Sequence, residues 1–314
     1  MTLLPVEPAH HLADRAEERR WLITGLWSEE AVGILGGEPK CCKSFLALDM
    51  AVSVAAGTTC LRRFPVTHPG RVLLYAAEDA LHVVRRRLEG ICSAAGVALC
   101  ELDIQVITAP TLRLDLEADC RNLEETVAAL QPRLLVLDPF VRLHRIDENA
   151  SGEVAPLLAF LRELQRRYGV AVGLVHHAKK GGGRVRAGQA LRGSSEFHAW
   201  GDSNLYLRRD GDVLSLAVEH RAAPSVPALV LELTQRGDAL ALEVVERRPA
   251  GEPLPTSVDE RITRALAEAG RPVSFPDLRA ACRVRTATLY ERLATMTAGG
   301  LLAKDGAGYR LADG

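Results

Sequence analysis

The sequence predicts an α/β protein, with a mostly parallel sheet between two layers of helices, antiparallel strands late in the sheet, and a small separate domain at the end. Short apolar runs alternate with amphipathic helical segments up to residue 178, as in parallel sheets buried on both faces. From Ser203 onward the apolar residues alternate around Asp-Gly and Gly-Asp turns, which predicts hairpins. Three prolines and a glycine within 247–257 indicate a linker before the final segment.

The elements follow in chain order. Residues 1–30 are expected to form a lead-in to the first domain, which spans 1–246. "VGILGG" (32–37) is a buried strand by its apolar run, and 43–57 is a helix by apolar spacing, ending at Gly57. The same patterns predict strands at 71–79, 104–110, 132–139 and 170–178, helices from about 80 to 95, at 120–131 and at 151–169, and hairpins within 203–221 and 228–247.

The segment 258–314 is predicted to be a winged helix–turn–helix domain. Its sequence pattern predicts a helix at 258–269, a short strand, a helix, a turn, another helix, and two strands around a glycine-containing tip. Five of its residues are candidates to face DNA: Arg283, Arg285, Thr286, Thr288 and Arg292. Because 257–314 holds nine basic and seven acidic residues, and winged helices also bind proteins, the partner is either duplex DNA or a protein.

Composition narrows the class of protein. With 47% hydrophobic and 25% charged residues and a net charge of −1, the 314-residue chain fits a soluble globular protein and is no polycation, so any DNA contact must come from local patches. Seven cysteines without a C-x-x-C pair argue against a disulfide framework and a zinc site. With no signal peptide and no membrane-length apolar run, the expected location is the cytoplasm.

"GGEPKCCKS" (36–44) nearly matches the phosphate-binding loop G-x-x-x-x-G-K-[ST], with Cys42 in place of the last glycine. It follows a buried strand and opens a helix, where backbone N–H groups bind phosphate oxygens. Lys43 is expected to reach the β- and γ-phosphates and Ser44 to hold Mg²⁺, while the small Cys42 side chain points away. The expected nucleotide-binding residues are Gly37, Glu38, Pro39, Lys40, Cys41, Cys42, Lys43, Ser44 and Phe45. The alternative is a strand–turn–helix that only resembles such a loop.

Two acidic positions end apolar strands. Asp138 closes "LLVLD", 95 residues after Lys43, and is typical of a Walker B acid that coordinates Mg²⁺. Glu78 ends "LLYAAED" and is favoured as the base that takes a proton from the attacking water, with neighbouring Asp79 as its rival. Either Glu78 or Asp79 is otherwise a helix N-cap.

His176 and His177 end the strand "VGLVHHA", at the edge where open α/β sheets bind ligands. One of them is a candidate to sense the γ-phosphate, with His177 preferred. The next segment, 179–195, is rich in glycine and lacks acidic residues, which suits a phosphodiester backbone. Its basic residues are Lys179, Lys180, Arg184, Arg186 and Arg192. The alternative for this segment is an ordinary solvated surface loop.

Together these motifs resemble the RecA-like P-loop ATPases of the AAA_25 type, and within them the RepA-type hexameric replicative helicases of plasmids. The resemblance covers about residues 30–225 and depends on the P-loop, "YAAED", "VLD" before "RLHRIDENASG", "LVHHAKKG" and "RGSS". It implies ATP and Mg²⁺ as ligands, a homohexameric ring with ATP between subunits, and single-stranded DNA in a central channel lined by the loop after the histidines.

The resemblance also implies an arginine finger donated by the neighbouring subunit. The family's arginine aligns near Asp202, so a substitute is needed. Arg221 is the first choice, Arg208 the second, and Arg209 a further candidate, unless all three are ordinary surface arginines. The leading expectation is therefore a DNA-stimulated ATPase and ring helicase of a plasmid, phage or mobile element. The alternatives are a nucleotide-controlled DNA-binding regulator or assembly switch with slow or no hydrolysis, and a helicase loader.

Overall fold

A sheet organises the first of the two units into which the chain divides, residues 1–246 and 247–314. The computed structural model describes residues 4, 6–11, 21–177, 196–211, 213–223, 226–236, 239–245, 258–282, 284, 286–305 and 308–312. Within these ranges the sheet has nine strands, in the order β11-β10-β9-β8-β3-β7-β6-β4-β5. The six strands from β8 to β5 are parallel, and β8 through β11 form an antiparallel meander at one side.

The strands are short and mostly buried. Their bounds are β3 Val32–Gly37, β4 Val72–Ala76, β5 Ile104–Val106, β6 Leu134–Asp138, β7 Ala171–His177, β8 Ser203–Asp210, β9 Val213–His220, β10 Val226–Arg236 and β11 Ala239–Val245. All residues of β3 and β6 are buried, as expected for central parallel strands covered on both faces. The parallel registers place the carboxyl ends of β3, β7, β6 and β4 along one edge of the sheet.

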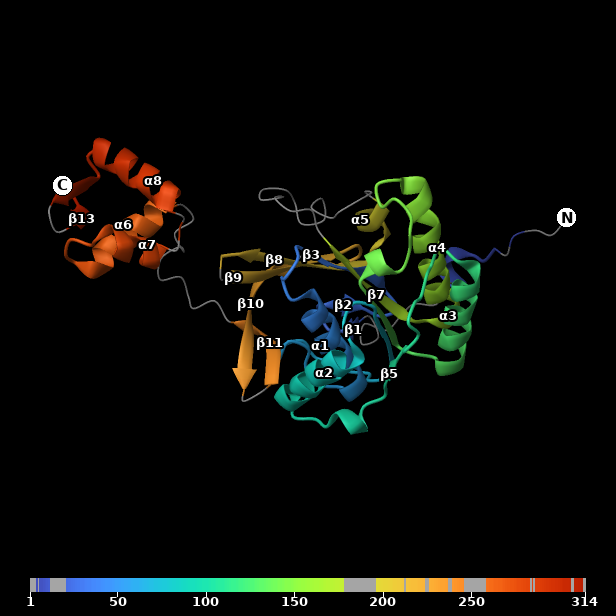
Figure 1. Ribbon diagram of the computed structural model, residues 1–314. Helices are drawn as coiled ribbons and strands as arrows, with labels where there is room; N and C mark the ends of the chain where they lie inside the picture. The colour runs from blue at the N-terminus through green and yellow to red at the C-terminus, as the bar shows by residue number, and fades with distance from the viewer. Residues whose placement is uncertain are drawn as a thin grey trace. The chain divides into compact units, whose positions relative to one another are not determined.

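Helices cover both faces of the sheet (Figure 1). The main helices are α1 Lys43–Ala56, α2 Leu81–Ala95, α3 Glu117–Leu130 and α4 Ser151–Tyr168, with a short α5 at Glu196–Trp200. One hydrophobic core joins α1 and α2 to the sheet, and a second core joins α3 and α4 to the other face. Alternate residues of β3 supply the two cores, with Leu35 in the first and Ile34 in the second.

The last strand of the meander, β11, lies beside α1 and α2 (Figure 1). Gly90 of α2 suits this close packing, because a Cβ atom there would lie a tight 3.3 Å from the backbone nitrogen of Leu240 in β11. The antiparallel strands therefore cover the first core as well as extending the sheet.

The second unit has its own small core. It contains α6 Val258–Ala269, α7 Phe275–Cys282, α8 Thr286–Ala298 and the antiparallel pair β12 Leu302–Asp305 and β13 Gly308–Leu311. An isolated bridge joins Val273 to Tyr309, which adds a third short strand contact beside the pair. The buried residues that hold the unit together are Ile262, Leu266, Leu278, Cys282, Leu289, Leu293, Met296, Leu302 and Tyr309.

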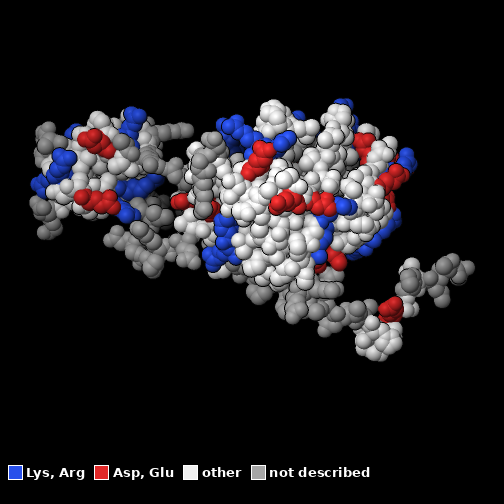
Figure 2. Space-filling view, turned by 90° about the horizontal axis from the view of Figure 1, so that it is seen from below, with Lys and Arg blue, Asp and Glu red and all other residues white. Residues whose placement is uncertain are grey.

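The predicted α/β fold class and element order of the first unit are confirmed, with two differences. The segment predicted as a lead-in contains a small two-stranded sheet, β1 Trp21–Ile23 with β2 Trp27–Ser28, whose Trp27 and Leu22 are buried in the first core. A helical turn, α5, was also not expected. Among the described residues, no helix is both long and apolar enough to cross a membrane. The face in Figure 2 carries basic and acidic side chains interspersed, in keeping with the net charge of −1.

Candidate functional site

The loop between β3 and α1 closes around a lysine ammonium. Lys43 is buried, and its Nζ donates to the carbonyl oxygens of Gly37 (3.0 Å) and Glu38 (2.9 Å). Burial lowers the pKa of Lys43. The loop thus holds a desolvated cation beside the N-terminus of α1, a combination that attracts phosphate.

Backbone conformation explains where this loop needs glycine and where it tolerates cysteine. A Cβ atom at Gly37 (φ 156°) would lie 2.4 Å from the Leu207 carbonyl oxygen and 2.6 Å from Cys41 Sγ, so no larger residue fits. Cys42 has φ 65°, the left-handed conformation that costs other residues about 1–2 kcal/mol relative to glycine. Its thiol accepts a contact from Arg209 Nη2 at 3.6 Å. The Cys42 side chain therefore points towards β8, which the sequence did not reveal.

A cavity of about 330 Å³ opens beside this loop, at the carboxyl-terminal edge of the parallel strands. Its lining residues are Lys40, Cys41, Cys42, Lys43, Ser44, Phe45, Ala76, Glu78, Asp79, Arg87, Asp138 and His177. The structure therefore brings together most of the candidates proposed for nucleotide, Mg²⁺ and water activation. Gly37, Glu38 and Pro39 do not line the cavity, although the first two hold Lys43.

Asp138, the last residue of β6, is a buried acid in the wall of the cavity. Burial raises the pKa of Asp138 to about 6, and a hydrogen bond from the Ser44 hydroxyl opposes part of this rise. A buried carboxylate beside a hydroxyl provides the hard oxygen ligands that Mg²⁺ prefers, with phosphate and water to complete the set. Ser44 and Asp138 thus fit the metal predicted for them.

Glu78 and Asp79 both line the cavity, and each is paired with an arginine that the sequence did not single out. Arg142 Nε donates to Glu78 Oε1 at 2.9 Å, and Arg87 forms an ion pair with Asp79. Arg87 also lies over the Phe45 ring, 5.3 Å from its centroid. The sequence contains 34 arginines, so no single one stood out before the fold placed it.

The two histidines that end β7 have different surroundings. His177 lines the cavity, whereas His176 is buried and stacks on Phe197 of α5, with ring centroids 4.2 Å apart. Phe140, which follows β6, packs edge-on against His176 at 5.8 Å. The preferred candidate, His177, is therefore the histidine in reach of a ligand, and His176 belongs to an aromatic cluster.

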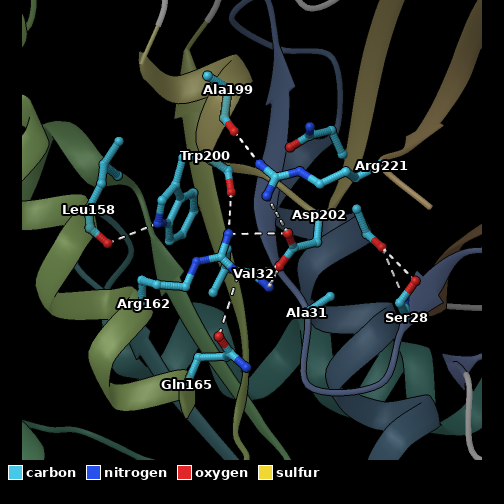
Figure 3. A network of polar contacts seen from close by, with 12 residues as sticks. Ser28, Ala31, Val32, Leu158, Arg162, Gln165, Ala199, Trp200, Asp202 and Arg221 are labelled. Carbon is cyan, nitrogen blue, oxygen red and sulfur yellow. Dashed lines mark hydrogen bonds and ion pairs between the residues drawn. The ribbon is translucent and has the colours of Figure 1, made fainter. Parts of the chain in front are cut away.

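Asp202 occupies the position where the resemblance places an arginine, and it is the centre of a polar network (Figure 3). Arg162 of α4 and Arg221, after β9, point to its carboxylate from two sides. Arg162 Nη2 to Asp202 Oδ1 is 3.2 Å, and Arg221 Nη1 to the same oxygen is 3.3 Å. The carboxylate also accepts the Val32 N–H. Since Val32 begins β3, the network lies at the opposite edge of the sheet from the cavity.

The arginine-finger candidates thus separate in space. Arg221 is 55% exposed and also donates to the Ala199 carbonyl oxygen, away from its own chain's cavity. Arg208 is exposed near the end of β8, the strand that runs parallel to β3 towards the P-loop. Arg209, beside it, contacts Cys42. Neither Arg221 nor Arg208 lines the cavity of its own chain.

The remaining candidates concern DNA. The segment 178–195 lies outside the described residues, as do Arg283 and Arg285. Thr286 is exposed at the start of α8, and Thr288 is partly buried. Arg292 Nε donates to Asp259 Oδ1 of α6 at 2.7 Å, so its guanidinium joins two helices of the second unit.

Comparisons with known proteins agree with the fold. A family model described as an AAA domain, AAA_25, matches residues 2–183, more than half of the chain. The crystal structure of the RadB recombinase is 18% identical with a TM-score of 0.51, covering 69% of this chain and 92% of the recombinase chain. A DnaB-like replicative helicase, solved with attention to its interactions with primase, is 13% identical with a TM-score of 0.50, covering 67% of this chain and 56% of the helicase chain. These likenesses show a RecA-like α/β fold.

Proposed function

The chain belongs to the AAA_25 family of AAA domains, and from this premise we propose that it is a DNA-stimulated ATPase that acts as a ring helicase on single-stranded DNA. The observation that carries the proposal is the cavity in which Lys43, Ser44, Glu78, Asp138 and His177 meet. A P-loop lysine, two acids from neighbouring strand ends and a histidine form the set needed to bind a nucleoside triphosphate and activate water.

In the proposed reaction a water oxygen attacks the γ-phosphorus while the bond to the β–γ bridging oxygen breaks, which releases ADP and phosphate. Glu78 accepts the proton that the water loses. Lys43 leaves the carbonyls of Gly37 and Glu38 for the phosphate oxygens and offsets the charge that develops there. His177 contacts the γ-phosphate and responds to its loss.

Ser44 and Asp138 would hold Mg²⁺, which when bound neutralises charge on the β- and γ-phosphates. Because burial raises the pKa of Asp138 to about 6, a growing fraction of this carboxylate is protonated as the pH falls below 6 in the nucleotide-free protein, and the proton competes with Mg²⁺. We therefore expect Mg²⁺-dependent nucleotide binding to weaken as the pH falls below 6.

DNA and assembly enter the proposal from resemblance. The solved structures of similar fold are those of a recombinase and a replicative helicase, which supports a DNA substrate. We propose a homohexameric ring with ATP between subunits, with the segment 179–195 on the DNA backbone. Arg221 of one subunit is the proposed finger for the next, and Arg208 is the second choice. The second unit, interpreted as a winged helix, would bind duplex DNA or a protein partner.

Two observations favour a second function, a nucleotide-controlled regulator or assembly switch with slow hydrolysis. Cys42 holds a strained conformation at the P-loop, and the family's arginine position is taken by Asp202 within an intrachain network. Both features reduce turnover more than they reduce binding. A helicase loader, the third alternative, shares the ATPase core.

The deciding experiment is the ATPase rate with and without single-stranded DNA, with Lys43→Ala as the control. We expect single-stranded DNA to raise the ATPase rate, Lys43→Ala to abolish ATP hydrolysis, and the wild type to unwind a forked duplex. No stimulation and no unwinding would contradict the helicase. Sequence-specific binding of duplex DNA by the full chain, with slow hydrolysis that DNA leaves unchanged, would support the regulator.

A mixing experiment tests the finger. Arg221→Ala subunits keep an intact P-loop, and Lys43→Ala subunits keep Arg221, so both homomers should be inactive. An equal mixture should recover about a quarter of the wild-type activity, because a quarter of the interfaces combine a good P-loop with a good arginine. If the Arg221→Ala homomer is fully active and the Arg208→Ala homomer is inactive, the finger is Arg208.

A further inference from the structure

We propose that Arg142 is a positioning residue that holds the carboxylate of Glu78 in place for water activation. This inference rests on the proposed ATPase function. It gives a role to Arg142, the first residue of the motif "RLHRIDENASG", to which the sequence assigned none. Arg142 Nε lies 2.9 Å from Glu78 Oε1, and the two residues are 64 positions apart in the chain.

The side from which Arg142 approaches distinguishes positioning from ligand binding. Glu78 lines the cavity, whereas Arg142 does not. The guanidinium contacts the carboxylate without lining the cavity, so we expect a nucleotide to enter without breaking the ion pair. Arg87, by contrast, lines the cavity itself beside Asp79, where a nucleotide would meet it directly.

The backbone beneath Arg142 is fixed. Phe140 and Leu143, on either side of it, are fully buried in the second core. The Arg142 N–H donates to the Pro139 carbonyl oxygen at 3.1 Å in a short helical turn directly after β6. The guanidinium thus extends from a rigid base, although its side chain is 61% exposed.

The Glu78 backbone is tied to the same turn. The N–H of Ala77 donates to the carbonyl oxygen of Asp138 at 2.7 Å, which joins the ends of β4 and β6 just before the two side chains meet. Glu78 itself is 42% exposed, so without a partner its side chain would sample several rotamers. One ion pair at an exposed site adds little to stability, which makes orientation its more important effect.

Arg142→Ala should therefore lower kcat and leave KM for ATP nearly unchanged. Misplacing a catalytic group by about 1 Å costs up to about 100-fold, so we expect a loss of about 10- to 100-fold. Arg142→Lys, which restores a cation without the guanidinium fork, should recover part of the loss. Arg145→Ala is the matched control, because Arg145 is an exposed arginine of the same loop whose contact with Asp115 uses the backbone N–H.

A double-mutant cycle with Glu78→Gln assigns the effect to the pair. In the full-length protein carrying Glu78→Gln, adding Arg142→Ala should not reduce the residual rate further. A loss equal to that seen in the wild-type background would show that Arg142 acts independently of Glu78 and would overturn the inference. If Arg142→Ala keeps the wild-type kcat and hydrolysis still requires Glu78, the inference about Arg142 is wrong, while the proposed ATPase function stands. No hydrolysis by the wild-type protein would overturn the proposed function as well.

Discussion

Charged side chains lie at both edges of the sheet, but their charges are compensated by different partners. At the carboxyl-terminal edge, Asp138 is buried with a pKa raised to about 6, and the hydrogen bonds of the Lys43 ammonium go to two loop carbonyl oxygens. At the opposite edge, the Asp202 carboxylate is bound by two arginines and a backbone N–H (Figure 3). The first edge keeps charges poorly compensated, as a ligand site requires, while the second uses its charges to hold the fold together.

The largest expected effect lies at the carboxyl-terminal edge. Glu78→Gln removes the proposed base and should lower kcat by about 10²- to 10⁴-fold, the usual contribution of a general base. The melting temperature should stay close to that of the wild type, because Glu78 is half exposed. Steady-state ATPase assays and thermal unfolding measure the two values. If Asp79→Asn has the larger effect on kcat, then the rival acid is the base.

At the other edge, stability should respond instead of catalysis. Arg162 is only 19% exposed, and Arg162→Ala removes its bonds to Asp202 and the Trp200 carbonyl. One hydrogen bond to a charged group contributes about 1.5–3 kcal/mol. Bonds within one network are not additive, and this pair is partly exposed to solvent, so we expect a total loss of about 2–3 kcal/mol. Arg221→Ala, at the exposed end of the same network, should cost under about 1 kcal/mol. Denaturant unfolding measures the free energy of unfolding of both variants. Equal losses would contradict the assignment of the larger stabilising role to Arg162.

Asp138→Asn should stabilise the nucleotide-free protein. The folded-state pKa, about 6, lies above the ordinary value, so the charged carboxylate costs stability above pH 6 and the cost disappears as the pH falls towards 4. Removing the charge at pH 7.5 should therefore add about 1–3 kcal/mol. The gain should shrink at pH 5. A variant destabilised at pH 7.5, measured by thermal unfolding, would mean that Asp138 is better compensated than its burial indicates.

The smallest expected effect concerns the P-loop backbone. Cys42→Gly relieves the left-handed strain, at the expense of a more flexible unfolded chain, so the net gain should be about 1 kcal/mol or less. ATP affinity should be equal or better, which a titration with labelled nucleotide measures. A large loss of affinity would assign the thiol, or its contact with Arg209, a positive role in binding.

The contrast between the edges also separates what the sequence predicted from what it did not. Parallel strands bring their carboxyl ends to one edge, so residues that end apolar runs, such as Glu78, Asp138 and His177, could be placed together without coordinates. The motif spacing carried this information. The P-loop itself was predicted down to Lys43 and Ser44.

Pairings between distant segments carried no such signal. Arg142 contacts Glu78, and Arg162 contacts Asp202, because the fold brings these distant residues together. The sequence contains so many arginines that neither of these two could be singled out. The different surroundings of His176 and His177 depend on the one-residue alternation of a strand and on Phe197 of an unpredicted helical turn. Tertiary packing, which local patterns do not encode, decided each of these contacts.

The most direct test of a nucleotide site at the carboxyl-terminal edge is a shift in melting temperature. Mg²⁺ and a non-hydrolysable ATP analogue are added to the wild type, Lys43→Ala and Asp202→Asn. A ligand that binds only the folded protein at 100 times its Kd stabilises by about 2.7 kcal/mol. We expect a clear rise for the wild type and for Asp202→Asn, which starts from a lower melting temperature, and no rise for Lys43→Ala. An equal rise in Lys43→Ala, or no rise in the wild type, would contradict a nucleotide site at the carboxyl-terminal edge.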